Sequence, residues 1–313
     1  MGVLVDGKWQ QRDELPTDAR GNFVRPESTF RDRVTADGSS GFPAEAGRYH
    51  LFVAYGCPWA HRSILYRKLK GLEGVIGMSE ATDMGPEGWW FPTGIDGAKS
   101  ELIQPVDGVL PLHRVYTTAN PTFTGRVTVP VLWDKRTGTI VNNESGEIIR
   151  MMDAEFDALG ARAPHFYTTE HAAEIDALNA AIYPRLNNGV YRAGFARSQE
   201  AYDKAVREVF SMLDELEQRL DGRRFLLGDQ PTEADWRLLP TLLRFDVAYF
   251  SAFKCNLRRI DEYPNLARYL RELYRFPGVA ETVRLEVYRR GYHSIRVVNP
   301  TGIVPIGPIV NLE

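Results

Sequence analysis

Cysteine is nearly absent from this sequence, with two residues in 313. Cys57 and Cys255 lie far apart in the chain, so they predict neither a disulfide framework nor a zinc site. The six histidines show no paired metal-ligand spacing either, and we expect no metal. Because a functional thiol suits a reduced compartment, we expect a cytoplasmic protein.

Long apolar runs and an excess of one charge are also missing. No stretch approaches transmembrane length, and the first residues show no basic segment followed by an apolar run. We therefore expect no membrane association and no secretory signal. The 38 basic and 41 acidic residues give a net charge of −3, which offers no electrostatic reason to expect a nucleic acid partner. The length allows two domains, and the sequence contains no internal repeats.

The most informative residue is Cys57. It follows an apolar run at residues 51–54 that predicts a buried strand, and it precedes Pro58, which suits the first position of a helix. Cys57 then caps a helix N-terminus, where free amides and the helix dipole favour a thiolate and lower its pKa. Position 60 is Ala60, so an external thiol must complete a reaction cycle, and glutathione is the candidate. The alternative is a small buried apolar side chain, which is the role we expect for Cys255.

The first half of the chain alternates between strand and helix patterns. Residues 1–47 are rich in Gly, Pro, Asp and Arg and predict an irregular arm. Residues 84–125 have little periodicity and predict an insertion without regular structure that has a functional role. Pro130 lies within a strand-like run and requires an edge, a bulge or a cis peptide bond. The expected regular elements are strands at 49–54, 75–79, 126–133 and 139–141, and helices at 58–69 and 146–152.

The second half is helical. Apolar residues recur at helical spacing along residues 172–182 and 205–220. Thr232 and Asp235 have the spacing of a capping box at the start of a further helix. Two more helical segments, at about 265–275 and 278–286, precede an extended tail at 288–313.

Several motifs resemble those of the glutathionyl-hydroquinone reductases, the Xi class of glutathione transferases. They are Cys-Pro-Trp-Ala at 57–60, Gly-Trp at 88–89, the run at 126–135, Asn-Glu-Ser at 143–145, and the segments at 188–196 and 299–305. The resemblance covers the whole chain and implies an α/β plus all-α architecture. A thioredoxin-like glutathione-binding domain (48–157, with the insertion 84–125) would be followed by an all-helical glutathione-transferase C-terminal domain (165–287). The N-terminal arm (1–47) and the C-terminal tail (288–313) would flank them.

The resemblance also implies a binding site for glutathione, with no nucleotide and no metal. Val129 would present its backbone to the cysteinyl part, if the bond to Pro130 is cis. Glu144 would bind the γ-glutamyl ammonium, and Ser145 would join the helix N-terminus in holding the carboxylate. The remaining implied contacts are Trp89, with Trp90 as the alternative, and Arg126, Val127 and Thr128.

Three tyrosines complete the implied site. Tyr191 would face Cys57 and move a proton at the substrate oxygen, while Tyr249 and Tyr292 would bond the sulfur and lower its pKa. The implied reaction is removal of glutathione from a glutathionyl-hydroquinone through a Cys57–glutathione mixed disulfide, which releases oxidised glutathione. The resemblance also implies a homodimer. An omega-like thiol transferase or dehydroascorbate reductase, and a non-catalytic binding module with the same fold, remain as alternatives.

Overall fold

The computed structural model describes residues 2–12, 14–92, 103 and 108–313. The chain divides into two compact units, and each is discontinuous in sequence. Unit 1 comprises residues 1–14 and 26–164, and unit 2 comprises residues 15–25 and 165–313. The expected arm at 1–47 is thus shared between the two units.

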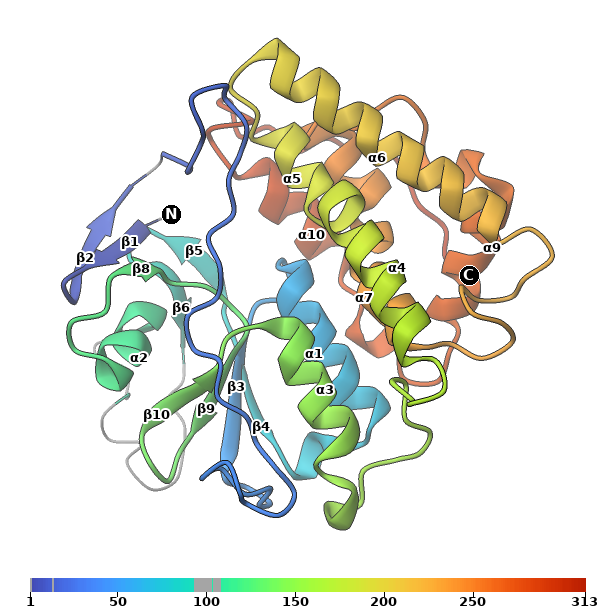
Figure 1. The fold of residues 1–313 in the computed structure, drawn as a ribbon. Coiled ribbons are helices and arrows are strands. Elements are labelled where there is room, and N and C mark those ends of the chain that lie inside the picture. The colour runs from blue at the N-terminus through green and yellow to red at the C-terminus, as the bar shows by residue number, and fades with distance from the viewer. Residues whose placement is uncertain (1, 13, 93–102, 104–107) are drawn as a thin grey trace. The chain divides into compact units, whose positions relative to one another are not determined.

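The central sheet of unit 1 has the strand order β10-β9-β3-β4 (Figure 1). Strand β3 is parallel to β4 and antiparallel to β9, and every residue of β3 is buried. Helix α1 forms the crossover that a parallel pair requires, and it packs against α3. These elements are β3 (Tyr49–Val53), α1 (Pro58–Leu69), η1 (Leu72–Gly74), β4 (Gly77–Glu80), β9 (Val131–Asp134), β10 (Thr139–Asn142), α3 (Ser145–Ala154) and η3 (Asp157–Leu159).

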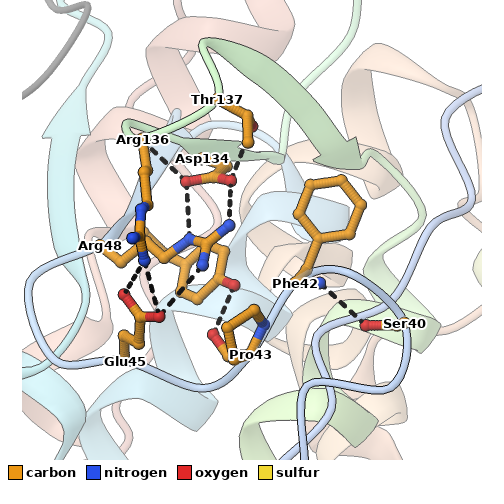
Figure 2. Close-up of polar contacts among 9 residues, drawn as sticks. Ser40, Phe42, Pro43, Glu45, Arg48, Asp134, Arg136 and Thr137 are labelled. Atoms are coloured by element: carbon orange, nitrogen blue, oxygen red, sulfur yellow. Dashed lines mark hydrogen bonds and ion pairs between the residues drawn. The ribbon is translucent and has the colours of Figure 1, made fainter.

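A buried ion pair joins β3 to β9 at one end of this sheet. Arg48, which directly precedes β3, donates from Nε and Nη2 to the two carboxylate oxygens of Asp134 at 2.9 and 2.7 Å. Figure 2 shows that the same carboxylate accepts from the amide of Arg136 and the hydroxyl of Thr137. Burial acts to raise the pKa of Asp134, but these hydrogen bonds lower it overall, so the carboxylate stays charged.

Two smaller sheets in unit 1 differ from the sequence-based expectation. The arm begins with a hairpin rather than irregular chain, and β8 pairs with its first strand in the order β2-β1-β8. The expected strand at 126–133 is interrupted, because its ends join different sheets: Arg126 pairs with β1 and Val131 with β3. The elements of the first small sheet are β1 (Gly2–Val5), β2 (Lys8–Gln11) and β8 (Gly125–Arg126).

The expected insertion at 84–125 also contains regular structure. A sheet of order β5-β6-β7 and a helix, α2, occupy its described part, whereas residues 93–102 and 104–107 lie outside the described residues. The elements are β5 (Asp83–Gly85), β6 (Gly88–Phe91), β7 (Leu110–Pro111) and α2 (Leu112–Ala119).

Unit 2 is helical. The expected capping box of Thr232 and Asp235 is present, and it starts α7. The segment near 278–286 is a 3₁₀ turn followed by α10, which continues to His293 where an extended tail was expected. The elements are α4 (Ala172–Ile182), η4 (Tyr183–Asn187), α5 (Gly189–Gly194), α6 (Gln199–Arg219), α7 (Glu233–Arg244), η5 (Phe245–Tyr249), α8 (Phe250–Ala252), η6 (Ile260–Glu262), α9 (Pro264–Tyr274), η7 (Ala280–Thr282) and α10 (Leu285–His293). Among the described helices, none is both long and apolar enough to cross a membrane.

His50 on β3 makes the stability of the fold depend on pH. Its imidazole lies 2.8 Å from the hydroxyl of Ser79, and burial lowers its pKa to about 3. In the unfolded chain His50 takes up a proton as the pH falls below about 6.5, whereas in the folded chain it stays neutral. The free energy of unfolding that is present above pH 6.5 is therefore lost as the pH falls toward 3. Between pH 7 and 5 this loss should be about 2 kcal/mol.

The variant His50→Gln should lack this part of the acid sensitivity. Chemical denaturation of both proteins at pH 7, 6 and 5 measures it. The free energy of unfolding should fall more steeply with falling pH in the native protein than in His50→Gln, and parallel curves would contradict the assignment to His50.

Candidate functional site

Cys57 lies at the N-terminus of α1. Its backbone is extended, with φ −83° and ψ 122°, and Pro58 occupies the first helical position, as the sequence predicts. The carbonyl oxygen of Cys57 accepts from the amide of His61 at 3.0 Å and starts the helix. The half-buried thiol donates to the carbonyl oxygen of Val129 at 3.5 Å. Cys57 is therefore the N-cap residue of α1, although its side chain makes no capping hydrogen bond, and its sulfur lies next to the segment that enters β9.

Val129 is positioned by the strand pairing. The bond between Val129 and Pro130 is cis. The predicted backbone role of Val129 requires this conformation. Val131 pairs with Phe52, so the chain before β9 runs beside the chain after β3. The predicted contact residue Val129 is thereby brought to Cys57.

Tyr116 on α2 supports this segment from within unit 1. Its hydroxyl donates to the carbonyl oxygen of Thr128 at 2.9 Å, and it accepts from the amide of Thr128 at 3.2 Å and from the side chain of Asn143 at 3.0 Å. The ring is fully buried, and burial raises the pKa of the hydroxyl, which keeps it protonated. Tyr116 thus ties the Thr128–Val129 segment to the start of α3.

Glu144 and Ser145 lie where α3 begins. Glu144 caps the helix by accepting from the amide of Gly146 at 3.0 Å, and its second oxygen accepts from Ser28 of the arm at 3.0 Å. Ser145 is buried, and its hydroxyl accepts from Arg62 of α1 at 3.4 Å. A hydroxyl that accepts from a guanidinium is left to donate its own proton, as binding a carboxylate requires.

The predicted glutathione contacts Arg126, Trp89 and Trp90 lie in the small strands β8 and β6. Arg126 lies in β8, directly before Val127. Trp89 and Trp90 are neighbours in β6, so their side chains point to opposite faces of the strand. Trp89 shares its face with Phe91, which packs on Phe52, but its contact with glutathione stays a prediction.

The three predicted tyrosines meet in unit 2. Tyr292 of α10 lies 2.5 Å from the hydroxyl of Tyr191 and 3.2 Å from that of Tyr249. The ring centroid of Phe253 lies 5.3 to 5.4 Å from the ring centroids of all three tyrosines. We call Tyr191, Tyr249 and Tyr292 the tyrosine cluster. Since Cys57 belongs to unit 1, the expected approach of Tyr191 to Cys57 stays a prediction.

Sequence analysis missed several residues beside these predicted positions. Ser28 and Tyr116 support the start of α3, and Arg25 places its guanidinium 4.7 Å from the ring centroid of Tyr191. The sequence carries no local signal for them, because two lie in the arm and one is among 14 tyrosines. Among the described residues, no group of three or more His, Cys, Asp or Glu side chains could hold a metal ion.

Comparison with known proteins gives full-length matches. The family model for the glutathione S-transferase N-terminal domain matches residues 56–155, and that for the C-terminal domain matches residues 199–272. The chain is 49% identical to the glutathionyl-hydroquinone reductase PcpF of Sphingobium chlorophenolicum, over 98% of this chain and 96% of that protein.

Two solved structures are similar over nearly their whole length. The glutathione-bound structure of YqjG from Escherichia coli K-12 has a TM-score of 0.87 and 46% identity, covering 99% of this chain and 97% of that one. A Xi class transferase from Natrialba magadii has a TM-score of 0.88 and 43% identity, covering 100% and 95%.

Replacing Tyr116 with Phe should both destabilise unit 1 and weaken glutathione binding. The change leaves the backbone of the half-buried Thr128 and the buried side chain of Asn143 without this partner, which should cost about 1–3 kcal/mol of stability. Chemical denaturation and glutathione titration measure the two effects. Tyr202→Phe is the matched control, since its hydroxyl makes one exposed bond, to the carbonyl oxygen of Lys254. Equal, small losses in both variants would contradict the role given to Tyr116.

Proposed function

This chain belongs to the glutathionyl-hydroquinone reductases, the Xi class of glutathione transferases, and we propose that Cys57 and the tyrosine cluster perform its reaction. The protein catalyses the glutathione-dependent reduction of glutathionyl-hydroquinones, with glutathione as co-substrate. The function, the enzyme class and the order of an α/β domain followed by a helical domain are thereby confirmed.

Cys57 is the proposed nucleophile. Its thiolate attacks the thioether sulfur of the substrate, and the electron pair of the carbon–sulfur bond stays with the ring, which gains a proton and leaves as a hydroquinone. A Cys57–glutathione mixed disulfide remains. A second glutathione thiolate attacks it, which releases oxidised glutathione and restores the Cys57 thiolate. The observation that carries this assignment is the position of Cys57 at the N-cap of α1, with its sulfur against the carbonyl oxygen of Val129.

Glutathione is proposed to lie along the segment from Arg126 to Val129 and across the N-terminus of α3. The backbone of Val129 would pair with the cysteinyl part, which places the glutathione sulfur near Cys57. Glu144 and Ser145 would bind the γ-glutamyl end, and their support comes from the first turn of α3 and the bond from Arg62. Trp89 would cover the peptide, and Arg126 would pair with a carboxylate.

Tyr191 is proposed to handle the proton at the ring hydroxyl. It would accept that proton while the carbon that bears the sulfur takes up a proton from solvent, which gives a keto form with a weaker carbon–sulfur bond. It would return the proton to the oxygen when the hydroquinone leaves. The hydrogen bonds that link Tyr191 to Tyr292 and Tyr249 support this role, because they give a proton or a charge more than one oxygen to occupy.

The same proposal includes a homodimer in the cytoplasm, without nucleic acid or membrane partners. The domain bounds 48–157 and 165–287 also belong to the proposal.

Replacing Cys57 with Ser should abolish turnover, because a serine hydroxyl cannot form the mixed disulfide. Release of free hydroquinone from a glutathionylated one measures the activity, and mass spectrometry should find the glutathione adduct on the native protein alone. Cys255→Ser is the control, since burial raises the pKa of that thiol and keeps it unreactive. Substantial turnover by Cys57→Ser would overturn the assignment.

Replacing Tyr191 with Phe should slow quinol substrates selectively. Proton transfer by a positioned side chain typically contributes about 10²–10⁴-fold in rate, and thiol exchange with a small glutathione mixed disulfide contains no such step. Turnover on the two substrates, compared in one variant, gives the measurement. An equal loss on both would leave Tyr191 a structural role and favour the omega-like thiol transferase as the alternative.

A further inference from the structure

The arm pairs with the chain that leads from the edge strand β10 into α3. The amide of Asn143 donates to the carbonyl oxygen of Phe30 at 3.1 Å, and its side-chain oxygen accepts from the amide of Phe30 at 3.1 Å. The amide of Asp32 donates to the carbonyl oxygen of Val141, in β10, at 3.0 Å. These bonds fix where the arm lies along this edge of the sheet, and they bring Ser28 beside the first residues of α3.

The hydroxyl of Ser28 reaches the carboxylate of Glu144. It donates to Oε2 of Glu144 at 3.0 Å, and it lies 3.3 Å from the carbonyl oxygen of Asn143, which is also an acceptor. Oε1 of Glu144 accepts from the amide of Gly146. The carboxylate is thus fixed through both oxygens, one by the first turn of α3 and the other by the arm. A carboxylate offers about four lone-pair sites, so each oxygen can accept a further hydrogen bond.

Glu144 is half-buried, and its charge is not balanced by a cationic side chain in contact with it. Within the part of the chain that the structure describes, no arginine, lysine or histidine forms an ion pair with Glu144. Arg31 of the arm pairs instead with Glu147, one position short of a full turn further along α3, and its charge acts on Glu144 only from a distance. A carboxylate that is held in place and partly desolvated favours a cationic ligand group.

Two serines beside this carboxylate have opposite hydrogen-bonding capacities. Ser28 gives its single proton to an acceptor, so its oxygen is left to accept. Ser145 accepts from Arg62, so its hydroxyl is left to donate. An ammonium only donates and a carboxylate only accepts. The zwitterionic end of a γ-glutamyl group carries both, and each of its charges therefore matches one of the two serines.

We propose that Ser28 of the arm is a glutathione-binding residue, which holds the Glu144 carboxylate in place and accepts, beside it, from the γ-glutamyl ammonium. The proposal rests on the proposed role of Glu144 as the ammonium site. It gives the arm a part in selecting the ligand, because the ammonium distinguishes a γ-glutamyl group from a plain acyl chain.

The test compares two ligands that differ only in this ammonium. Reduced glutathione and its desamino analogue, glutaryl-cysteinyl-glycine, are titrated calorimetrically at pH 7 into the native protein, Ser28→Ala and Ser28→Thr. Ser39→Ala is the matched control, because Ser39 is another serine of the arm whose hydroxyl donates to a carboxylate, that of Asp37 at 2.7 Å. Neither titration involves turnover, so the result does not depend on the reaction.

The native protein should bind glutathione at least about tenfold more tightly than the analogue, since the ammonium makes charged hydrogen bonds. In Ser28→Ala the affinity for glutathione should fall about threefold to tenfold, while that for the analogue should change less than about twofold. Ser28→Thr, which keeps the hydroxyl, and Ser39→Ala should both preserve the native ratio of affinities.

A purely structural role of Ser28 would weaken both ligands equally. Equal losses in Ser28→Ala, no loss for either ligand, or a ratio in Ser28→Thr as low as in Ser28→Ala would each overturn the proposal. The variant Glu144→Gln separates this inference from its premise. A ratio that falls in Glu144→Gln but not in Ser28→Ala keeps the role of Glu144 and overturns that of Ser28. A native ratio in Glu144→Gln would show that the ammonium binds elsewhere, and both assignments would then fail.

Discussion

The antiparallel pairing of β3 with β9 is the constraint on which the rest of unit 1 depends. Cys57 follows one strand and Val129 precedes the other, so the register that pairs Phe52 with Val131 also sets the sulfur against a backbone carbonyl. The opposite end of the same pair is held by Arg48 and Asp134. A buried, bidentate ion pair is costly to misalign, because a shifted register would leave two charges without partners.

Unit 2 reaches its aromatic site by different means. Its three tyrosines come from α5, from a π-helical turn and from α10, and they are gathered around Phe253 rather than along one strand edge. The π-turn inserts one extra residue into the helix, which redirects Tyr249 relative to the apolar face of α7. Such bulges are frequent at functional sites.

What the sequence predicted was local. The order of strand, Cys57, Pro58 and helix is encoded in adjacent residues, and so is the capping box at Thr232, and both are present. What it missed depends on partners distant in the chain. The strands of the arm form because β8 is available to pair with β1, and the predicted strand through Val129 is divided because its two ends belong to different sheets.

The site residues also divide into those that adjacent residues reveal and those that depend on distant partners. Cys57 is visible from its immediate neighbours, whereas Ser28 and Tyr116 acquire their roles only when the arm and α2 reach the start of α3. No spacing rule in a single sequence identifies such residues, since the contacts join segments more than twenty positions apart. The resemblance to a family located the tyrosines, but it did not point to Arg25, whose guanidinium lies over the ring of Tyr191.

The assignment of residues 15–25 to unit 2 bears on how this fold can be divided and recombined. The peptide chain passes from one unit to the other after Glu14, after Arg25 and again after Pro164. A fragment that starts at residue 165 would lack Phe23, which packs edge-on against Phe195, and the bond from Ser198 to the carbonyl oxygen of Arg20. Exchange of the helical half between related proteins by a single crossover would therefore pair it with a foreign arm, whose side chains had been selected to cover a different helical surface.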